Sequence, residues 1–514
     1  SSFIRAAYLR ELGIFQMIGV NSNKAEFKQV YDMLTVRAQT KEQGDEESVQ
    51  IVPASEDEDA AELHSKTGTA GTYLTLMKAF VGIGILAMPG AFAHAGYILG
   101  SVCLVLISVV SYYCSILLIH TKDYLIEQGA IKSSGPSMSG GPAQGISHHV
   151  GVGAGVGPLD ASVSRMSESN AGTNDITPSS TYAATDISKA GKSGSLSHSV
   201  TFQELGLKVF GQRGKWAIEA GICVSQVSFV CAYFLFIGDN VAAVVNKDGI
   251  FGSGTFYTLI ATVAAVPLVY LKSIKKLVPA AILADVIIIF GLGVIFAYDF
   301  ITIDRVHETV SAFTPSGLPL FFGIAVFAFE GINIILPVEQ SMEDPKKFSG
   351  VLRQSYVHLT VVMILLGALS YSAFGESTQT PILFSLPDND LVKSVQIMYS
   401  IALFFSVPLQ MVPAFNIMES YPFYKNVFGG NMYVFRLLVI VAAGGIASVI
   451  PNFGLFLNLI GAVAGTATAF ILPSMLYMTA LDKWHAWRPL FCLIFGSVGG
   501  LIAFIVSCIE FAEG

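Results

Sequence analysis

The sequence predicts an all-α membrane protein of eleven transmembrane helices, in which the first and the sixth helix are interrupted. Composition predicts the membrane class, because 53% of the 514 residues are hydrophobic and only 13% are charged, whereas soluble proteins carry about 25% charged residues. Glycines and a carboxyl group in the middle of two apolar runs predict the interruptions.

Apolar runs of roughly 18 residues or more are long enough to cross a bilayer. Eleven such runs follow one another along the chain, each bounded by polar or turn-forming residues. In order they lie at about 70–94, 96–124, 216–244, 254–272, 276–298, 317–339, 351–374, 391–417, 432–450, 453–479 and 487–509. Residues 67–126 therefore hold helices one and two, and residues 201–510 hold helices three to eleven.

Two polar segments complete the chain. Residues 1–66 are predicted to form a cytosolic tail, and residues 127–200 a disordered cytosolic insertion rich in Gly and Ser. Segments of this composition cannot bury enough apolar surface to offset the entropy lost on ordering.

Basic residues in the short loops predict the orientation, because cytosolic loops carry an excess of Lys and Arg. Ten such residues fall on one side and three on the other, which places the N-terminus in the cytosol and the C-terminus in a lumen or outside the cell. The ten are Lys272, Lys275, Lys276, Lys346, Lys347, Arg353, Lys425, Arg436, Lys483 and Arg488, and the three are Lys247, Arg305 and Lys393.

The first run contains the segment KAFVGIGILAMP, Lys78–Pro89, with Gly82 and Gly84 where a spanning helix should be strongest. A glycine inside a helix costs roughly 1 kcal/mol relative to alanine, and lipid leaves freed backbone groups unsatisfied. Transporters tolerate interrupted helices near the midplane, where the freed groups bind substrates and ions. Close packing between helices is the alternative role of these glycines. Lys78 is interpreted as a residue that extends to the interface or as the partner of a buried carboxyl.

The sixth run places Glu330 beside Gly331, with Pro337 beyond them. An intramembrane carboxyl indicates a functional site, with a structural carboxyl bonded to a neighbouring helix as the alternative. Interruptions in the first and sixth helices are what an inverted five-plus-five repeat predicts. The N-termini of the half-helices would offer N–H donors to an anion such as a substrate carboxylate.

Several further polar and aromatic residues have both a functional and a structural interpretation. Asp285 and Glu219 are intramembrane acids that fit a proton path or simple pairing, and Glu339 is interpreted as an interface residue. Tyr233 fits helix packing better than a pocket. Pocket shape would depend on side chains of helices three, six, eight and ten.

Several functions are excluded by what the sequence lacks. It has no basic stripe or nucleic-acid motif, and no HExxH, GxSxG or P-loop pattern, so neither nucleic-acid binding nor an enzyme with catalytic residues is expected. The six cysteines lie in apolar runs without a CxxC pair, which argues against a disulfide framework or a metal site. No cofactor is expected, and the expected partners are the lipid bilayer and a small molecule.

Four segments carry a family resemblance. They are TYLTLMKAFVGIGILAMPGAFAHAGYILG in the first run, FQELGLKVFGQRGKW before the third, FIGDN at its end and FAFEGINIILPVEQSMEDPKKF in the sixth. They resemble the amino acid/auxin permease family of the amino acid–polyamine–organocation superfamily, and within it the vacuolar and proton-coupled (PAT-type) amino acid transporters. The resemblance covers about 67–510 apart from the insertion.

The resemblance implies a fold like that of the bacterial leucine transporter, with helices one to five and six to ten as inverted repeats. It also implies secondary active transport of amino acids, usually small neutral ones, often coupled to protons and often in vacuolar or lysosomal membranes. From the two interruptions we expect alternating access around a site at the midplane, and the plasma membrane is the other expected location. Carried over by residue, the substrate would lie against Val81, Gly82, Ile83, Gly84, Phe327, Ala328, Phe329 and Glu330.

The coupling ion is less well defined by the resemblance. Animal proton-coupled members carry a His three residues before the lysine, where this chain has Thr75. If that His assists proton coupling, this chain must couple differently or through Glu330, which is the candidate for a proton gradient, and sodium is left open as an alternative ion. Asn333 replaces a glycine-like position and would narrow the pocket. A membrane sensor that binds an amino acid without significant flux is the alternative function, and a channel is a further one.

Overall fold

The computed structural model describes residues 66–131, 200–245, 252–271, 278–303 and 309–513, all within the unit Ser65–Gly514. The predicted tail, apart from its last residue, and nearly all of the predicted insertion lie outside the described residues. So do Lys247, Lys272, Lys275, Lys276 and Arg305. The orientation inferred from loop charges therefore stays a prediction.

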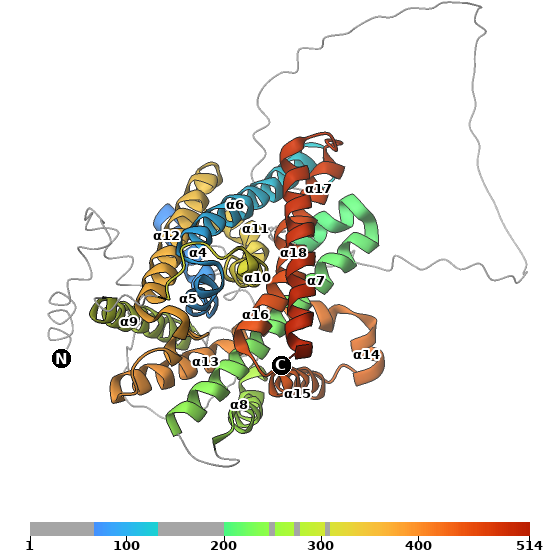
Figure 1. Ribbon diagram of the computed structural model, residues 1–514. Helices are drawn as coiled ribbons and strands as arrows, with labels where there is room; N and C mark the ends of the chain where they lie inside the picture. Colours follow the sequence, from blue (N-terminus) through green and yellow to red (C-terminus); the bar gives the residue numbers. More distant parts are fainter. Residues whose placement is uncertain (1–65, 132–199, 246–251, 272–277, 304–308, 514) are drawn as a thin grey trace, which may run out of the picture. The chain divides into compact units, whose positions relative to one another are not determined.

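Helices make up most of the described part (Figure 1). The longer ones, in chain order, are α4 (Thr69–Phe80), α5 (Gly84–Ala95), α6 (Tyr97–Glu127), α7 (Phe202–Val245), α8 (Gly254–Val269), α9 (Val278–Thr302), α10 (Leu318–Ala328), α11 (Ile332–Ser341), α12 (Phe348–Phe374), α13 (Asp390–Ser420), α14 (Pro422–Phe428), α15 (Met432–Val449), α16 (Phe453–Ile460), α17 (Leu472–Ala480) and α18 (Trp487–Glu513). Two π-helical turns, η8 (Gly461–Gly465) and η9 (Ala467–Ile471), join α16 to α17.

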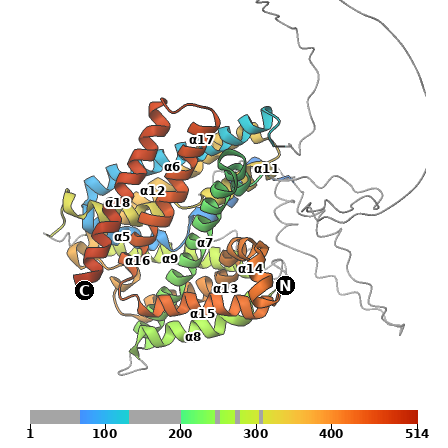
Figure 2. The same cartoon turned by 90° about the vertical axis from the view of Figure 1, so that its right-hand side faces the viewer.

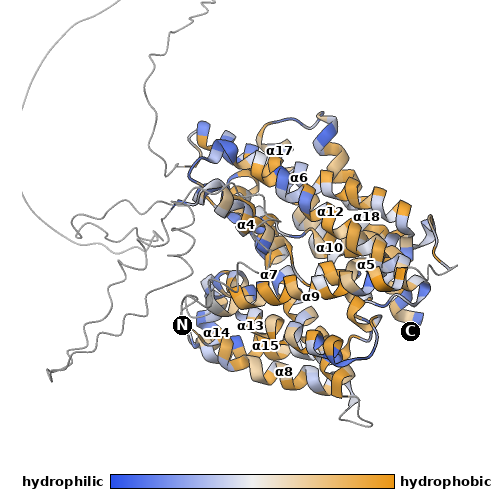
Figure 3. Ribbon diagram, turned by 90° about the vertical axis from the view of Figure 1, so that its left-hand side faces the viewer, coloured by the Kyte–Doolittle hydropathy of each residue, from blue (hydrophilic) through white to orange (hydrophobic). Residues whose placement is uncertain are grey.

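Apolar residues dominate these helices, as Figure 3 shows. Within the described residues, nine helices are long and apolar enough to cross a membrane, or ten spans if the bent pair α4–α5 counts as one. The run predicted at 254–272 forms α8, which has only 16 residues. The helices coincide with the predicted apolar runs, but the count of eleven and the five-plus-five repeat stay predictions.

Both predicted interruptions are present. Helix α4 ends at Phe80 and α5 begins at Gly84, with an angle of 57° between them. Val81 between them has extended backbone angles, φ −81° and ψ 96°. Helix α10 ends at Ala328 and α11 begins at Ile332, and this pair counts as a single span without a comparable bend. Glycine, which lacks a side chain, thus weakens both helices at the positions where the sequence predicts an interruption.

Helix α10 occupies a central position against α5, α16 and α18 (Figure 1). Glycines allow the close approach, since a Cβ atom at Gly461 would lie 2.9 Å from the backbone nitrogen of Phe327. Interiors are packed at crystal-like density, so such contacts hold α10 in place. The interruption in the sixth predicted span is therefore surrounded by helices.

A second group of helices packs around α7. Helix α13 lies along α7, and α8, α13 and α15 lie side by side (Figure 2). Arg436 of α15 connects them, because its Nε donates to Glu419 Oε1 of α13 at 2.7 Å and its Nη1 to the Val269 carbonyl of α8 at 3.0 Å. Fork-shaped arginine contacts fix orientation as well as distance. Of this group, α7 and α13 form one side of the cavity described next.

Candidate functional site

The two interruptions contact each other reciprocally. A Cβ atom at Gly84, the start of α5, would lie 2.9 Å from the Cα atom of Ala328, the end of α10. A Cβ atom at Gly331, just before α11, would lie 2.7 Å from the Cδ1 atom of Phe80, the end of α4. The start of each second half-helix therefore packs against the end of the other pair's first half-helix.

Gly82 and Gly84 have different surroundings. A Cβ atom at Gly82 would meet nothing within 4 Å, whereas one at Gly84 would collide with α10. The close-packing interpretation is therefore correct for Gly84, and the open surroundings of Gly82 fit a residue that faces a cavity.

Unpaired backbone groups gather at this junction. In the described part of the chain, the N–H groups of Gly82, Ile83 and Gly84 have no backbone acceptor, while those of Ile85 and Leu86 bond to Gly82 and Ile83 at 3.2 Å. The start of a helix carries about +0.5 of an elementary charge and its end about −0.5. Two helix starts and two helix ends meet here, so the junction offers donors to an anion and acceptors to a cation.

A cavity of about 1150 Å³ lies at the junction. Pockets for small molecules measure about 300–1,000 Å³, so this cavity is large enough for a small molecule. Six of the eight predicted site residues line it, and the other two, Val81 and Phe329, do not. The six are Gly82, Ile83, Gly84, Phe327, Ala328 and Glu330. Phe329 is 2% exposed and stacks on Tyr356 with ring centroids 6.0 Å apart.

Glu330 lies at the second interruption and is 7% exposed. Neither of its carboxyl oxygens makes a hydrogen bond of good distance and angle with a described residue, although the Ser225 hydroxyl lies near enough to interact with the carboxyl. Oδ1 of Asn333 likewise has no hydrogen-bond partner among the described residues. Glu330 and Asn333 both line the cavity. Buried polar atoms without partners are rare in proteins and need a functional or structural reason. A bound polar molecule would provide their missing hydrogen bonds.

Helices α7 and α13 supply the opposite side of the cavity. These helices are the third and eighth predicted runs, which were expected to shape the pocket, but none of their residues was predicted as a site residue. The tenth run, which forms α16 to α17, was also expected to shape the pocket but does not line the cavity. The lining residues of α7 include Lys215, Glu219, Ile222, Gln226, Phe229 and Tyr233, and those of α13 include Gln410, Pro413, Asn416 and Ser420. Their spacing of three and four residues marks one face of each helix, and amides in apolar helices are the signal that could have identified them.

Glu219 is paired, in contrast to Glu330. Tyr421 donates a hydrogen bond to its carboxylate, and Lys215 Nζ lies 3.6 Å from Oε1. Burial and this hydrogen bond raise the pKa of Tyr421 to about 12. The phenol therefore stays a donor at neutral pH, which favours the interpretation of Glu219 as a paired acid.

Two other charged residues have partners outside the cavity. Lys78 Nζ lies 2.7 Å from Asp285 Oδ2 of α9, with 43% and 34% of the side chains exposed. Lys78 is thus paired with a carboxylate, but this carboxylate is half-exposed, whereas the sequence interpretation named a buried one. Glu339, interpreted from sequence as an interface residue, is instead 5% exposed and bonds to Lys122. The sequence interpretation did not include this partner, because hydropathy alone does not reveal a charge on a neighbouring helix.

Comparison with known proteins adds independent information. A sequence model of the family described as "Transmembrane amino acid transporter protein" matches residues 65–134 and 178–510. Vacuolar amino acid transporter 3 of Saccharomyces cerevisiae is 28% identical over 432 residues, which cover 81% of this chain and 52% of that protein. Amino acid transporter ANT1 of Arabidopsis thaliana is 26% identical over 460 residues, which cover 84% of this chain and 90% of that protein.

The chain spans about half the length of the yeast relative. Among solved structures, the manganese transporter of Eremococcus coleocola, in complex with an aromatic bis-isothiourea substituted compound, covers 90% of this chain with a TM-score of 0.42 and 11% identity. The match extends over 89% of that chain, but the similarity is too low to define the fold.

Proposed function

Since the chain belongs to the family of transmembrane amino acid transporter proteins, we propose that it moves amino acids across a membrane by secondary active transport. The family and the relatives are transporters and not enzymes, and the chain is a multi-pass membrane protein. Because the yeast relative carries the name vacuolar amino acid transporter, a vacuolar or lysosomal-type membrane is the proposed location.

The reciprocal contact of the two interruptions around a cavity is the observation that supports this proposal most. A zwitterion needs donors for its carboxylate and acceptors for its ammonium group. We place the carboxylate on the unpaired N–H groups of Gly82, Ile83 and Gly84, at the start of α5, where the helix dipole favours negative charge. We place the ammonium group near the end of α10 and Glu330, which offers two unpartnered oxygens.

Glu330 is the proposed proton carrier. A carboxyl without a partner in a buried cavity is costly as an anion, so it favours either a bound cation or a proton. Protonation would weaken its interaction with the substrate ammonium group and shift the population between two states of access. Transport by alternating access with proton coupling follows from this role.

Small neutral amino acids are the proposed substrates. Gly82 leaves open space beside the proposed carboxylate position, while Phe229, Tyr233 and Phe327 give the cavity aromatic lining. These side chains suit a modest apolar substituent better than a second full charge.

The test is a flux assay with the full chain in proteoliposomes and a panel of labelled amino acids. We expect saturable uptake of small neutral amino acids that a proton gradient accelerates and a sodium gradient does not. Uptake that a proton gradient leaves unchanged would refute the coupling. Saturable binding without flux would instead favour a sensor, and flux that does not saturate would favour a channel.

A further inference from the structure

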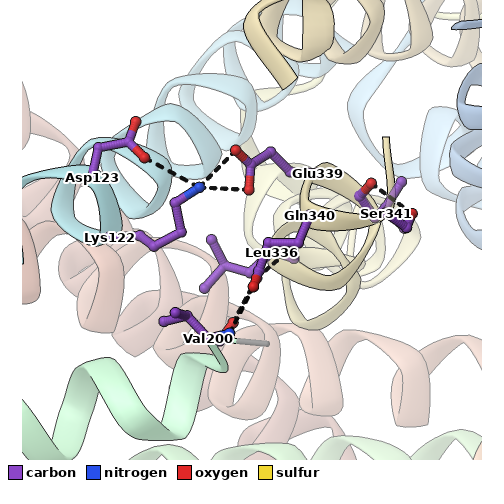
Figure 4. A network of polar contacts seen from close by, with 8 residues as sticks. Lys122, Asp123, Val200, Leu336, Glu339, Gln340 and Ser341 are labelled. Carbon is purple, nitrogen blue, oxygen red and sulfur yellow. Dashed lines mark hydrogen bonds and ion pairs between the residues drawn. The ribbon is translucent and has the colours of Figure 1, made fainter. Parts of the chain in front are cut away.

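Three consecutive residues at the end of α11 each contact a different segment of the chain, and Figure 4 shows the contacts of the first two, Glu339 and Gln340. Glu339 binds Lys122 of α6, Gln340 binds Val200 just before α7, and the carbonyl of Ser341 accepts from the backbone of Thr67 just before α4. None of these residues lines the cavity, so the proposed transport mechanism does not use them.

The contact between Lys122 and Glu339 is a buried ion pair. Lys122 Nζ donates to both carboxylate oxygens of Glu339 at 2.6 Å, and only 6% and 7% of the two side chains are exposed. A second carboxylate, Asp123 Oδ1, lies 3.1 Å from the same nitrogen but is 53% exposed. A buried ion pair adds little net stability, but removal of one partner leaves a costly unpaired charge in this arrangement.

Gln340 forms a two-way clamp with the backbone of Val200. The Val200 N–H donates to Gln340 Oε1 at 2.6 Å, and Gln340 Nε2 donates to the Val200 carbonyl at 2.7 Å. The residues that follow Val200, 201–204, line the cavity, as does Pro337 of α11. Thr201 among them is exposed, so the cavity meets solvent there. The clamp therefore joins the α11 side of the cavity to its α7 side beside this opening.

Helices α4 and α11 are also tied to each other at both ends. At the interruptions Phe80 packs against Gly331. At the other end the Thr67 N–H donates to the Ser341 carbonyl at 2.8 Å, and the Glu343 N–H donates to the Thr67 carbonyl at 2.9 Å. The two half-helices thus form one side of the cavity, which the contacts of Glu339 and Gln340 hold against α6 and the start of α7.

We propose that Lys122, Glu339 and Gln340 are positioning residues that keep the joined half-helices α4 and α11 in the arrangement with the cavity accessible past residues 201–204. The proposal rests on the proposed function, because accessibility from one end is one state of a transport cycle. It needs no contact between these residues and the substrate. Loss of either anchoring contact would depopulate the accessible state.

Thiol labelling measures this accessibility directly. The reporter Ile334→Cys lies on the α11 side of the cavity, and the parent chain with its own six cysteines gives the background. With a water-soluble maleimide and the full chain in detergent, we expect Lys122→Met and Glu339→Gln to lower the labelling rate constant about fivefold or more, as a shift of population predicts. The charge exchange Lys122→Glu with Glu339→Lys should restore it to within about twofold of the reporter alone.

Lys347→Met is the matched control. Lys347 forms an exposed ion pair with Asp344 at 3.3 Å near the same end of α11, and its loss should leave the rate constant unchanged. Gln340→Leu removes the clamp without stranding a charge and should also lower the rate constant. If Lys122→Met and Glu339→Gln do not fold, the labelling rate constant of Gln340→Leu alone tests the proposal. Parent-like rate constants in the folded anchor variants would overturn the proposal.

Transport kinetics separate positioning from a structural defect. Depopulating the accessible state raises the apparent KM by the same factor as it slows labelling, whereas fewer folded molecules lower only the maximal rate. A raised KM in Gln340→Leu therefore supports the proposal, and a lowered maximal rate at unchanged KM contradicts it. If the parent transports no amino acid, the proposed function fails, while the labelling result still decides the positioning.

Discussion

Adding one methyl group at either glycine of the first interruption should separate packing from substrate binding. Gly84→Ala places a Cβ atom against the backbone of Ala328, and Gly82→Ala places the same group in open space. The two variants are matched in chemistry and lie two residues apart, so they differ only in what the methyl group meets.

The size of the effect at Gly84 follows from the contact distances. The new carbon would lie 2.9 Å from Ala328 Cα and 3.2 Å from Phe327 Cδ1, whereas carbon atoms pack best at about 3.5–4.0 Å. Helices α5 and α10 must therefore move apart by about 0.6 Å or more. Overpacking of this kind costs about 1–3 kcal/mol, from which the reduced freedom of the unfolded chain recovers about 0.4–1 kcal/mol. At the middle of both ranges the expected net destabilisation is about 1.3 kcal/mol, and at most it is about 2.6 kcal/mol.

The expected effect at Gly82 is on binding. Stability should be unchanged or higher by about 0.4–1 kcal/mol, because the methyl group meets no neighbour. The group would hinder a carboxylate that approaches the N–H groups of Gly82 and Ile83. Loss of one hydrogen bond to a charged group is worth about 1.5–3 kcal/mol, which corresponds to about a 10- to 100-fold rise in KM.

Thermal unfolding of the purified chain in detergent and uptake kinetics in proteoliposomes measure the two effects. We expect Gly84→Ala to unfold at a lower temperature with a lower maximal rate, and Gly82→Ala to unfold like the parent with a raised KM. A parent-like unfolding temperature for Gly84→Ala would refute the packing argument. An unchanged KM for Gly82→Ala would refute the placement of the substrate carboxylate.

Three further predictions concern single side chains. Glu330→Gln should abolish the acceleration of uptake by a proton gradient while binding persists; full pH-driven accumulation in this variant would exclude Glu330 as the proton carrier. Arg436→Lys should lower the unfolding temperature, at a cost of about 1–3 kcal/mol, since a lysine cannot make both fork contacts with Glu419; a parent-like melting curve would contradict this. Tyr421 has its pKa raised from 10.0 to about 12, so its contribution to stability is full below pH 10 and declines as pH rises from 10 to 12. The stability difference between the parent and Tyr421→Phe should therefore shrink over that interval, and a constant difference would show that the hydrogen bond to Glu219 is not responsible.

The sequence predicted the positions of the membrane helices and both interruptions, because these depend on local properties. An apolar run long enough to cross lipid must satisfy its backbone as a helix, and a central Gly82 or Gly331 weakens that helix whatever surrounds it. Six of the eight named residues at these interruptions line one cavity.

Errors and omissions arose where a residue's role depends on a partner far away in the chain. Phe329 was named with Glu330, but it packs on Tyr356 and does not line the cavity. Glu339 was interpreted as an interface residue, and its buried partner Lys122 of α6 was not predicted. Hydropathy and spacing contain no information on which helix faces which.

By itself, the amino-acid sequence determined the membrane class, the places where two helices break and the family to which the chain belongs. Only the tertiary structure decided that Gly84 is packed and Gly82 is open, that α7 and α13 complete the cavity, and that α11 is held at its far end by Glu339 and Gln340. Breaks arise from local backbone energetics, whereas contacts between helices depend on packing among residues hundreds of positions apart in the chain.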